Sequence, residues 1–186
     1  PEKEYCVSVE QGEEKAEISF CTEAQDYTVN VRDFGARGDG VQDDTLYIQA
    51  AIMACPKDSR VLIPEGVYRI TSLFLKDHLT LELAKGAVLS ADTQREKFPI
   101  LKGTCQNEEK GKEYILGTWE GDACDMFSGI ITGIGVKDVT IYGEGIIDGN
   151  ASWENWWFEA KKIRIAARPR MIFLNRCENV QIVGIT

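Results

Sequence analysis

The chain has 186 residues and a formal net charge of -9, and 44% of its residues are hydrophobic, which is enough for one domain with a buried core. An acidic chain of this kind is a poor nucleic-acid binder. No apolar run approaches 18 residues, so we expect no transmembrane helix and no membrane partner.

Residues 1–28 show a weak alternation of apolar and polar side chains on both sides of Gln-Gly-Glu-Glu (11–14). This pattern predicts a β-hairpin. Because two strands alone are marginally stable, we interpret residues 1–28 as a β-rich appendage or as the tail of a preceding domain. Residues 29–186 form the second predicted unit.

The stretch 29–45 reads as a short strand, a glycine-punctuated loop and the start of a helix. Asp43 or Asp44 can cap that helix, which we expect over 45–55, with Pro56 ending it. Apolar residues spaced by three or four positions predict one buried helix face, made of Leu46, Ile48, Ala51, Ile52 and Cys55.

Strand signals then follow closely, with turns between them and no helix of crossover length. The expected strands are 60–64, 67–70, 73–75, 79–83 and 87–91. A weak repeat selects the architecture. Lys-Asp-Val-Thr-Ile-Tyr-Gly (137–143) matches Glu-Asn-Val-Gln-Ile-Val-Gly (178–184), and 77–83 is a looser copy. Such copies are typical of the coils of a solenoid, so we predict an all-β chain that forms a parallel β-helix.

Two insertions interrupt the coils. Residues 92–125 are polar and glycine-containing, and we expect a long loop there. After Asp148-Gly149, Ser152 can cap a short helix that carries Trp153, Trp156 and Trp157, before a strand at 171–174. Of the six cysteines, Cys6–Cys21 and Cys105–Cys124 would each close a local loop; the alternative is six buried thiols.

Three segments together resemble glycoside hydrolase family 28, the polygalacturonases. They are Asp-Phe-Gly-Ala-x-Gly-Asp-Gly-x-x-Asp-Asp-Thr (33–45), Val-Thr-Ile-Tyr-Gly-Glu-Gly-Ile-Ile-Asp-Gly-Asn (139–150) and Arg-Pro-Arg-Met-Ile-Phe-Leu-Asn-Arg-Cys-Glu-Asn-Val (168–180). The resemblance implies the N-terminal coils of a right-handed parallel β-helix with the helix plugging its open end. It also implies inverting hydrolysis of galacturonan in pectin, by a secreted or periplasmic enzyme that acts on the plant cell wall.

The family's catalytic signatures, Asn-Thr-Asp, Gly-Asp-Asp, Gly-His-Gly and Arg-Ile-Lys, do not occur in this sequence. We therefore expect no catalytic residues in this chain, which alone should be inactive, and place them beyond Thr186. Asp43 and Asp44 are interpreted as helix caps, and Asp148 as a turn residue bonded to nearby backbone. One histidine and no Cys-x-x-Cys predict no metal site, and no cofactor is expected.

Substrate-binding candidates are Arg168, Trp156 and Trp157. Residues 161–186 carry six basic and one acidic side chain, and arginine pairs bidentately with carboxylates such as those of uronates. Indole faces can stack on sugar rings. The alternatives are a structural arginine in a solvated basic face and two tryptophans that pack the insertion onto the coil wall.

A polysaccharide is thus the expected partner. The rival function is a tailspike-like β-helix that binds polysaccharide, or is purely structural, without cutting it. A pectate lyase would need calcium-binding aspartates, and no acidic cluster supports one.

Overall fold

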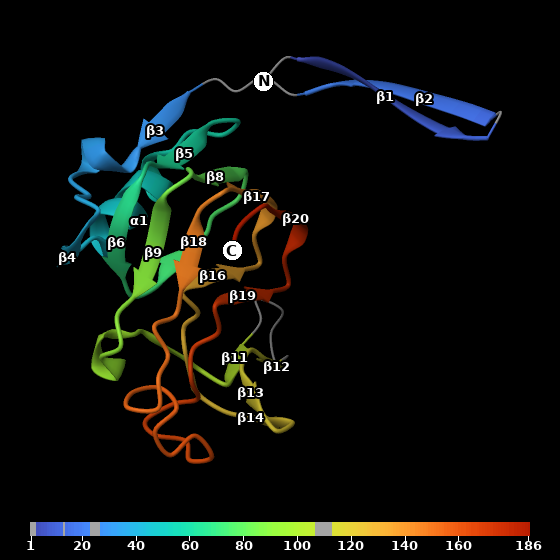
Figure 1. Cartoon of the computed structure of the whole chain (residues 1–186). Coiled ribbons are helices and arrows are strands. Elements are labelled where there is room, and N and C mark those ends of the chain that lie inside the picture. Colours follow the sequence, from blue (N-terminus) through green and yellow to red (C-terminus); the bar gives the residue numbers. More distant parts are fainter. Residues whose placement is uncertain (1–2, 13, 23–26, 107–112) are drawn as a thin grey trace.

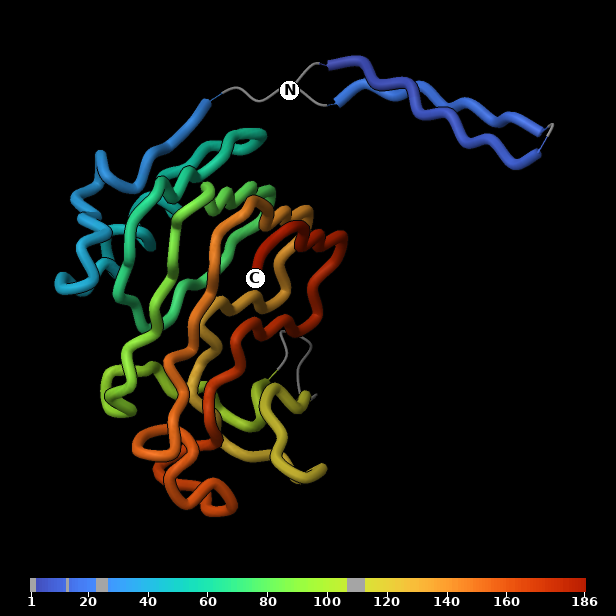
Figure 2. The backbone as a smooth tube through the Cα atoms, in the orientation of Figure 1, coloured from blue at the N-terminus to red at the C-terminus, as the bar shows by residue number. Residues whose placement is uncertain are grey.

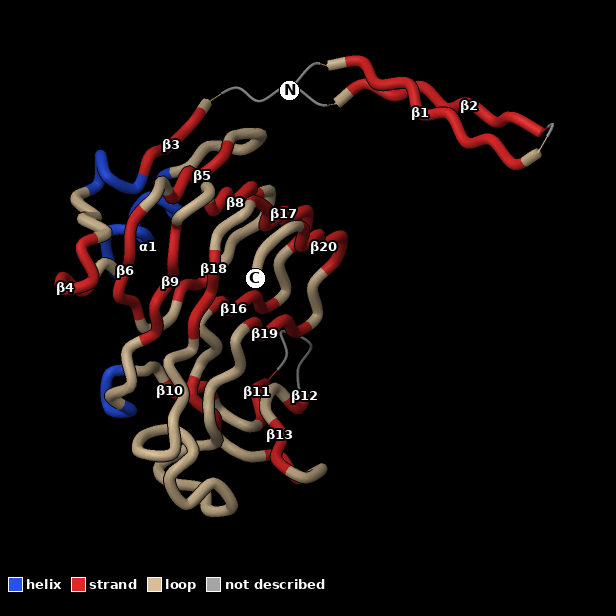
Figure 3. The backbone as a smooth tube through the Cα atoms, viewed as in Figure 1, coloured by secondary structure: helices blue, strands red, loops and turns tan. Residues whose placement is uncertain are grey.

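The computed structural model describes residues 3–12, 14–22, 27–106 and 113–186. Short strands alternate with turns along most of the chain, and the strands of successive coils stack on one another (Figures 1 and 3). The strands of the coils are β3 (Thr28–Asn30), β4 (Asp39–Asp43), β5 (Arg60–Ile63), β6 (Gly66–Ile70), β7 (Leu73–Phe74), β8 (Leu79–Leu83), β9 (Ala87–Ala91), β16 (Ile131–Ile134), β17 (Lys137–Gly143), β18 (Ile146–Asp148), β19 (Ile172–Asn175) and β20 (Glu178–Val183).

Within the described residues these strands form three parallel sheets. The five-stranded sheet has the order β20-β17-β8-β5-β3, the four-stranded sheet β18-β9-β6-β4 and the three-stranded sheet β19-β16-β7. The chain visits the three sheets in turn, so that each circuit is one coil of a parallel β-helix. The predicted fold class is therefore confirmed.

The strands that carry the sequence repeat lie next to one another in the stack of coils. β17 pairs in parallel with both β8 and β20, and Val139 lies opposite Leu79 on one side and Val180 on the other. The column Val29, Val61, Leu81, Ile141 and Ile182 crosses all five strands of that sheet in register. Its three central members are fully buried. Burying each such side chain contributes about 1.5–3 kcal/mol, so the column is a main element of the core.

Helix α1 (Thr45–Ala54) follows β4 and packs against β7. The Gln49 side chain accepts a hydrogen bond from the backbone N–H of Phe74 (2.7 Å) and donates one to its carbonyl (2.9 Å). These bonds satisfy edge groups that would otherwise face solvent. The helix therefore covers the first coil as a cap.

The predicted buried face of α1 is correct except for Leu46. Ile48, Ala51 and Ile52 are fully buried, and Cys55 just past the helix is 1% exposed, but Leu46 is 79% exposed. Leu46 lies in the first turn of the helix, and its side chain faces solvent.

The loop before the helix is held by buried Asp44. Its carboxylate accepts hydrogen bonds from the backbone N–H groups of Arg37 and Gly38, both at 2.9 Å. Gly38 has φ +61°, and a Cβ there would lie 2.8 Å from the Tyr68 ring, so glycine is required. At the N-terminus of the helix, the Asp43 side chain accepts a hydrogen bond from the backbone N–H of Thr45 (3.1 Å). Residues 39–43, expected as loop, form β4.

The N-terminal hairpin is present as β1 (Glu4–Gln11) and β2 (Glu14–Cys21), paired antiparallel. All its described residues are exposed. Tyr5 stacks on Phe20 with ring centroids 5.6 Å apart. The division of the chain at residue 28 stays a prediction.

The structure shows all six cysteines as free thiols. In the hairpin, Cys6 lies opposite Ser19 and Cys21 opposite Glu4, so the two thiols are out of register for a direct cross-strand pair. Cys55 is buried, and that burial raises the pKa of its thiol, while the charge of Lys76 opposes the shift. Neither of the expected disulfides is formed.

Both insertions differ in detail from expectation. Residues 92–127 hold a short 3-10 helix, η2 (Arg95–Lys97), and the small strands β10 (Ile100–Leu101), β11 (Thr104–Gln106), β12 (Glu113–Ile115), β13 (Thr118–Trp119), β14 (Asp122–Ala123) and β15 (Met126–Phe127). Residues 153–161 form consecutive turns and not the expected helix. Neither insertion adds a strand to the parallel sheets. Both lie below the stacked coils in Figure 2. No described helix is long and apolar enough to cross a membrane.

Candidate functional site

The two insertions leave the β-helix at the same corner. One joins β9 to β16 and the other joins β18 to β19. Since β18 pairs with β9 and β19 pairs with β16, the two connections start and end on neighbouring strands. They therefore lie side by side, below the stacked strands in Figure 1.

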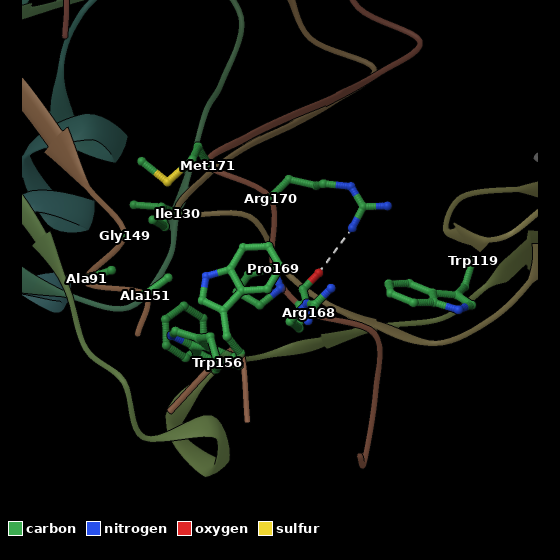
Figure 4. A pocket seen from close by; sticks show the side chains of 12 residues that line it. Ala91, Trp119, Ile130, Gly149, Ala151, Trp156, Arg168, Pro169, Arg170 and Met171 are labelled. Atoms are coloured by element: carbon green, nitrogen blue, oxygen red, sulfur yellow. Dashed lines mark hydrogen bonds between the residues drawn. The ribbon is translucent and has the colours of Figure 1, made fainter. Parts of the chain in front are cut away.

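A cavity of about 170 Å³ opens between these insertions (Figure 4). Small and apolar residues from the coils line one part of it: Ala91, Ile130, Gly149 and Met171. The insertions contribute Phe98, Trp119, Ala151, Trp156, Trp157, Arg168, Pro169 and Arg170. The cavity thus joins an apolar wall to aromatic rings and two guanidinium groups.

Trp156 is a packing residue. It is 4% exposed, and its ring meets Phe98 (5.4 Å between centroids) and Phe127 (5.7 Å) edge to face. Edge-to-face contacts of this kind stabilise aromatic clusters. For Trp156 the alternative interpretation, packing of the insertion onto the coil wall, therefore agrees with the structure.

Trp157 keeps an exposed face. It is 44% exposed, and the guanidinium carbon of Arg168 lies 4.5 Å from its ring centroid. The same carbon lies 5.5 Å from the centroid of Trp119, which belongs to the other insertion. Two cation–π contacts thus hold the Arg168 side chain where the insertions meet. The structure brings all three predicted binding residues to one cavity.

No acidic side chain in the described part of the chain lies within 4.0 Å of the Arg168 guanidinium, so its positive charge has no partner there. Its Nη1 atom is buried without a hydrogen-bond partner in that part of the chain. The neighbouring Arg170 donates to the carbonyls of Arg168 (3.2 Å) and Thr118 (3.4 Å). Both guanidinium groups thus lie at the cavity, and a cavity lined by two cationic side chains favours an anionic ligand.

Trp119 and Arg95 were missed by sequence reasoning. Trp119 lies in a stretch with no hydrophobic period, so nothing in the sequence connects it with Arg168, 49 positions later. Arg95 follows β9, and its guanidinium carbon lies 4.5 Å from the centroid of Trp156. Only the stacking of coils brings these pairs together.

Three carboxylates, in the loop before α1 and after β18, have structural partners. Asp44 is fully buried and holds the loop before α1, and Asp148 accepts a hydrogen bond from Asn150 N at 2.8 Å. Asp39 accepts from the backbone N–H groups of Gln42 and Val41, which lower its pKa below the ordinary value. None of the three lines the cavity. Among the described residues, no cluster of metal-binding side chains is found.

Comparison with known proteins agrees with this architecture. The family model for rhamnogalacturonase A/epimerase, pectate lyase-like, matches residues 28–115. An exo-poly-alpha-D-galacturonosidase of Dickeya chrysanthemi is 31% identical over 134 residues, which cover 72% of this chain and 21% of that protein. Plasmin and fibronectin-binding protein A of Streptococcus pneumoniae is 29% identical over 168 residues, or 88% of this chain and 21% of the relative. The chain thus spans about a fifth of either relative.

A solved structure of a family 28 exopolygalacturonase from Yersinia enterocolitica matches 100% of this chain and 40% of that protein, with a TM-score of 0.76 and 25% identity. These findings define the class as a right-handed parallel β-helix of the pectate lyase-like kind. Within this class, the chain is similar to a segment of the polygalacturonases of glycoside hydrolase family 28, as its motifs predicted.

Proposed function

We propose that this chain is the N-terminal part of a polygalacturonase-like hydrolase that cleaves galacturonan in pectin. The observation that carries the proposal is the match of the whole chain to a family 28 exopolygalacturonase structure. The parent protein would be secreted or periplasmic, since its polymeric substrate in the plant cell wall lies outside the cell that makes the enzyme.

In the proposed reaction, a carboxylic acid protonates the glycosidic oxygen as the bond to the anomeric carbon breaks. A carboxylate takes a proton from water, whose oxygen attacks that carbon from the opposite face and inverts its configuration. The acid and base must lie about 6.5–9.5 Å apart. We assign both roles to residues outside positions 1–186, because Asp43, Asp44 and Asp148 each bond to nearby backbone.

The cavity between the insertions would bind the substrate. Arg168 pairs with a uronate carboxylate, and the half-exposed ring of Trp157 stacks on a sugar face. Trp156 supports both by fixing the turn that carries Trp157. The uncompensated charge of Arg168 and the exposed ring beside it support these roles.

The test compares two proteins, residues 1–186 alone and the same chain extended by the downstream coils of its reading frame. Only the extended protein should release reducing ends from polygalacturonate. Release by residues 1–186 above a heat-inactivated control would contradict the assignment and reopen Asp43, Asp44 and Asp148 as candidates.

A second candidate is a binding protein without hydrolytic activity. The relative named plasmin and fibronectin-binding protein A favours it, because that name describes binding and no reaction. This candidate predicts that polygalacturonate in an affinity gel retains the extended protein. The protein should release no reducing ends from this polymer.

A further inference from the structure

Three arginines lie over aromatic rings of the insertion that joins β18 to β19. Arg168 lies over Trp157, Arg95 over Trp156 (4.5 Å) and Arg164 over Phe158 (5.1 Å). Arg95 comes from the other insertion. Three consecutive aromatic side chains thus each carry one guanidinium.

Two of these groups meet at one carbonyl. Nη2 of Arg95 donates to the carbonyl of Asn155 at 3.3 Å, and Nη2 of Arg164 donates to the same oxygen at 3.4 Å. Two cations that share one acceptor repel each other, and this repulsion strengthens as water is excluded. Partial burial, and then the charges of Arg164 and Arg168, lower the pKa of Arg95 below its ordinary value.

No acidic side chain in the described part of the chain lies within 4.0 Å of Arg95, Arg164 or Arg168. The exposed carboxylate of Glu159 interacts with the cluster from further away, because the charge of Arg164 adds to that of a neighbouring lysine in lowering its pKa. Elsewhere the chain does pair its arginines where they are half-buried, as in the 2.7 Å contact between Arg60 and Glu82. The unpaired cluster therefore differs from the rest of the molecule and suits a ligand with more than one negative charge.

We propose that Arg95 and Arg164 form a second anion site beside Arg168, so that the two sites together bind the carboxylates of two neighbouring sugar units in an acidic oligosaccharide. This inference rests on the proposed function and deepens it. The site would select stretches in which adjacent uronates are both unesterified. A single uronate would occupy only the Arg168 position and gain nothing from the second site.

The test is isothermal titration of the 186-residue chain with mono-, di- and trigalacturonate at low ionic strength. We expect the di- and trisaccharides to bind at least roughly tenfold more tightly than the monosaccharide. Arg95→Gln should remove this advantage and leave the affinity for the monosaccharide unchanged. Arg95→Lys, which keeps the charge, should restore most of it. Arg176→Gln is the matched control, because Arg176 also stacks on an aromatic ring, that of Tyr114 (4.2 Å), but lies in the turn between β19 and β20 and not in this cluster.

If Arg95 acts only in packing, Arg95→Gln lowers the affinities for all three sugars equally. Arg95→Lys then lowers them in the same way. That result, or equal affinity of mono- and trigalacturonate for the unmodified chain, overturns the inference. Binding of a sulfated disaccharide in place of digalacturonate, with the same dependence on Arg95, would support the paired anion site and contradict galacturonan as the substrate.

Discussion

Asn179 donates a hydrogen bond from Nδ2 to Oδ1 of Asp138 at 2.7 Å, across two neighbouring coils. The other oxygen of Asp138 lies 3.2 Å from Nδ1 of His78 on the preceding coil. All three residues lie at the beginning of paired strands and have left-handed backbones, with φ of 54°, 55° and 51° in chain order. They form a ladder of equivalent turns.

This ladder gives the first prediction. Asp138→Val should lower the free energy of unfolding by about 1–3 kcal/mol, because a β-branched residue resists the left-handed conformation and both side-chain contacts are lost. Asp138→Asn is the matched control, since asparagine tolerates that conformation and its carbonyl can still accept from Asn179. Urea denaturation measures the free energy of unfolding of both variants. Equal losses in the two would show that the ladder geometry contributes nothing to stability.

The capping helix gives the second. Ile52 is fully buried, so Ile52→Asp should lower the free energy of unfolding by about 3 kcal/mol or more, because a charge would be buried without a partner. Leu46→Asp makes a similar chemical change in the first turn of the helix, at a 79% exposed position, and we expect an effect below about 0.5 kcal/mol. An unchanged melting temperature of Ile52→Asp would contradict the cap.

The third prediction concerns pH. Burial alone would raise the pKa of Asp92, but the hydrogen bond from Lys97 (2.7 Å), that from Gln94 N (2.9 Å) and the nearby charges outweigh it, so the pKa is lowered. A lowered folded-state pKa means that the ionised carboxylate stabilises the fold above its unfolded-state pKa. This stabilisation is lost as the pH falls through the folded-state value.

Asp92→Asn should therefore be clearly less stable than the unmodified chain at about pH 7, and the gap should narrow towards about pH 3. Denaturant midpoints across this range measure the gap. Asp122→Asn, at an exposed carboxylate, serves as the control and should change little. A gap that does not vary with pH would show that Asp92 acts through shape and not through charge.

The fourth prediction tests Arg168 in the extended protein. Arg168→Ala should lower kcat/KM on polygalacturonate by about tenfold or more, since a charge-assisted pair with a carboxylate is lost. On the methyl ester, which has no charge for Arg168 to pair with, the loss should be smaller. Reducing-end assays on both polymers measure the ratio of the two losses in kcat/KM, with Arg176→Ala as the control. Equal losses on both substrates would identify Arg168 as a structural residue.

The sequence predicted the coils well because their signal is local. Apolar residues two apart, closed by turn residues, recur at 79–83, 137–143 and 178–183, and these strands are those that pair. The register follows from matching the copies of the repeat, since each copy lies beside the next one in the stack of coils. The helix was equally clear, although Leu46 shows that an apolar residue in the right period need not be buried at a helix end.

The insertions could not be predicted in the same way. The spacing of Trp153, Trp156 and Trp157 suggested a helix, yet Asn155 accepts from Ser152 N through its side chain (2.7 Å), and turns form instead. Contacts with the first insertion determine which indole is buried, and these join residues far apart in sequence. Arg168 was found from its charge, but its contact with Trp119 required the folded chain.

Because both insertions begin and end on neighbouring strands of the same two sheets, their length is independent of the coil stack beneath them. Residues could be added to or removed from 92–127 and 149–171 without shifting any strand of the three parallel sheets. This corner is therefore a natural position for exchanging segments between related β-helices, whereas the turns at His78, Asp138 and Asn179 leave no such freedom.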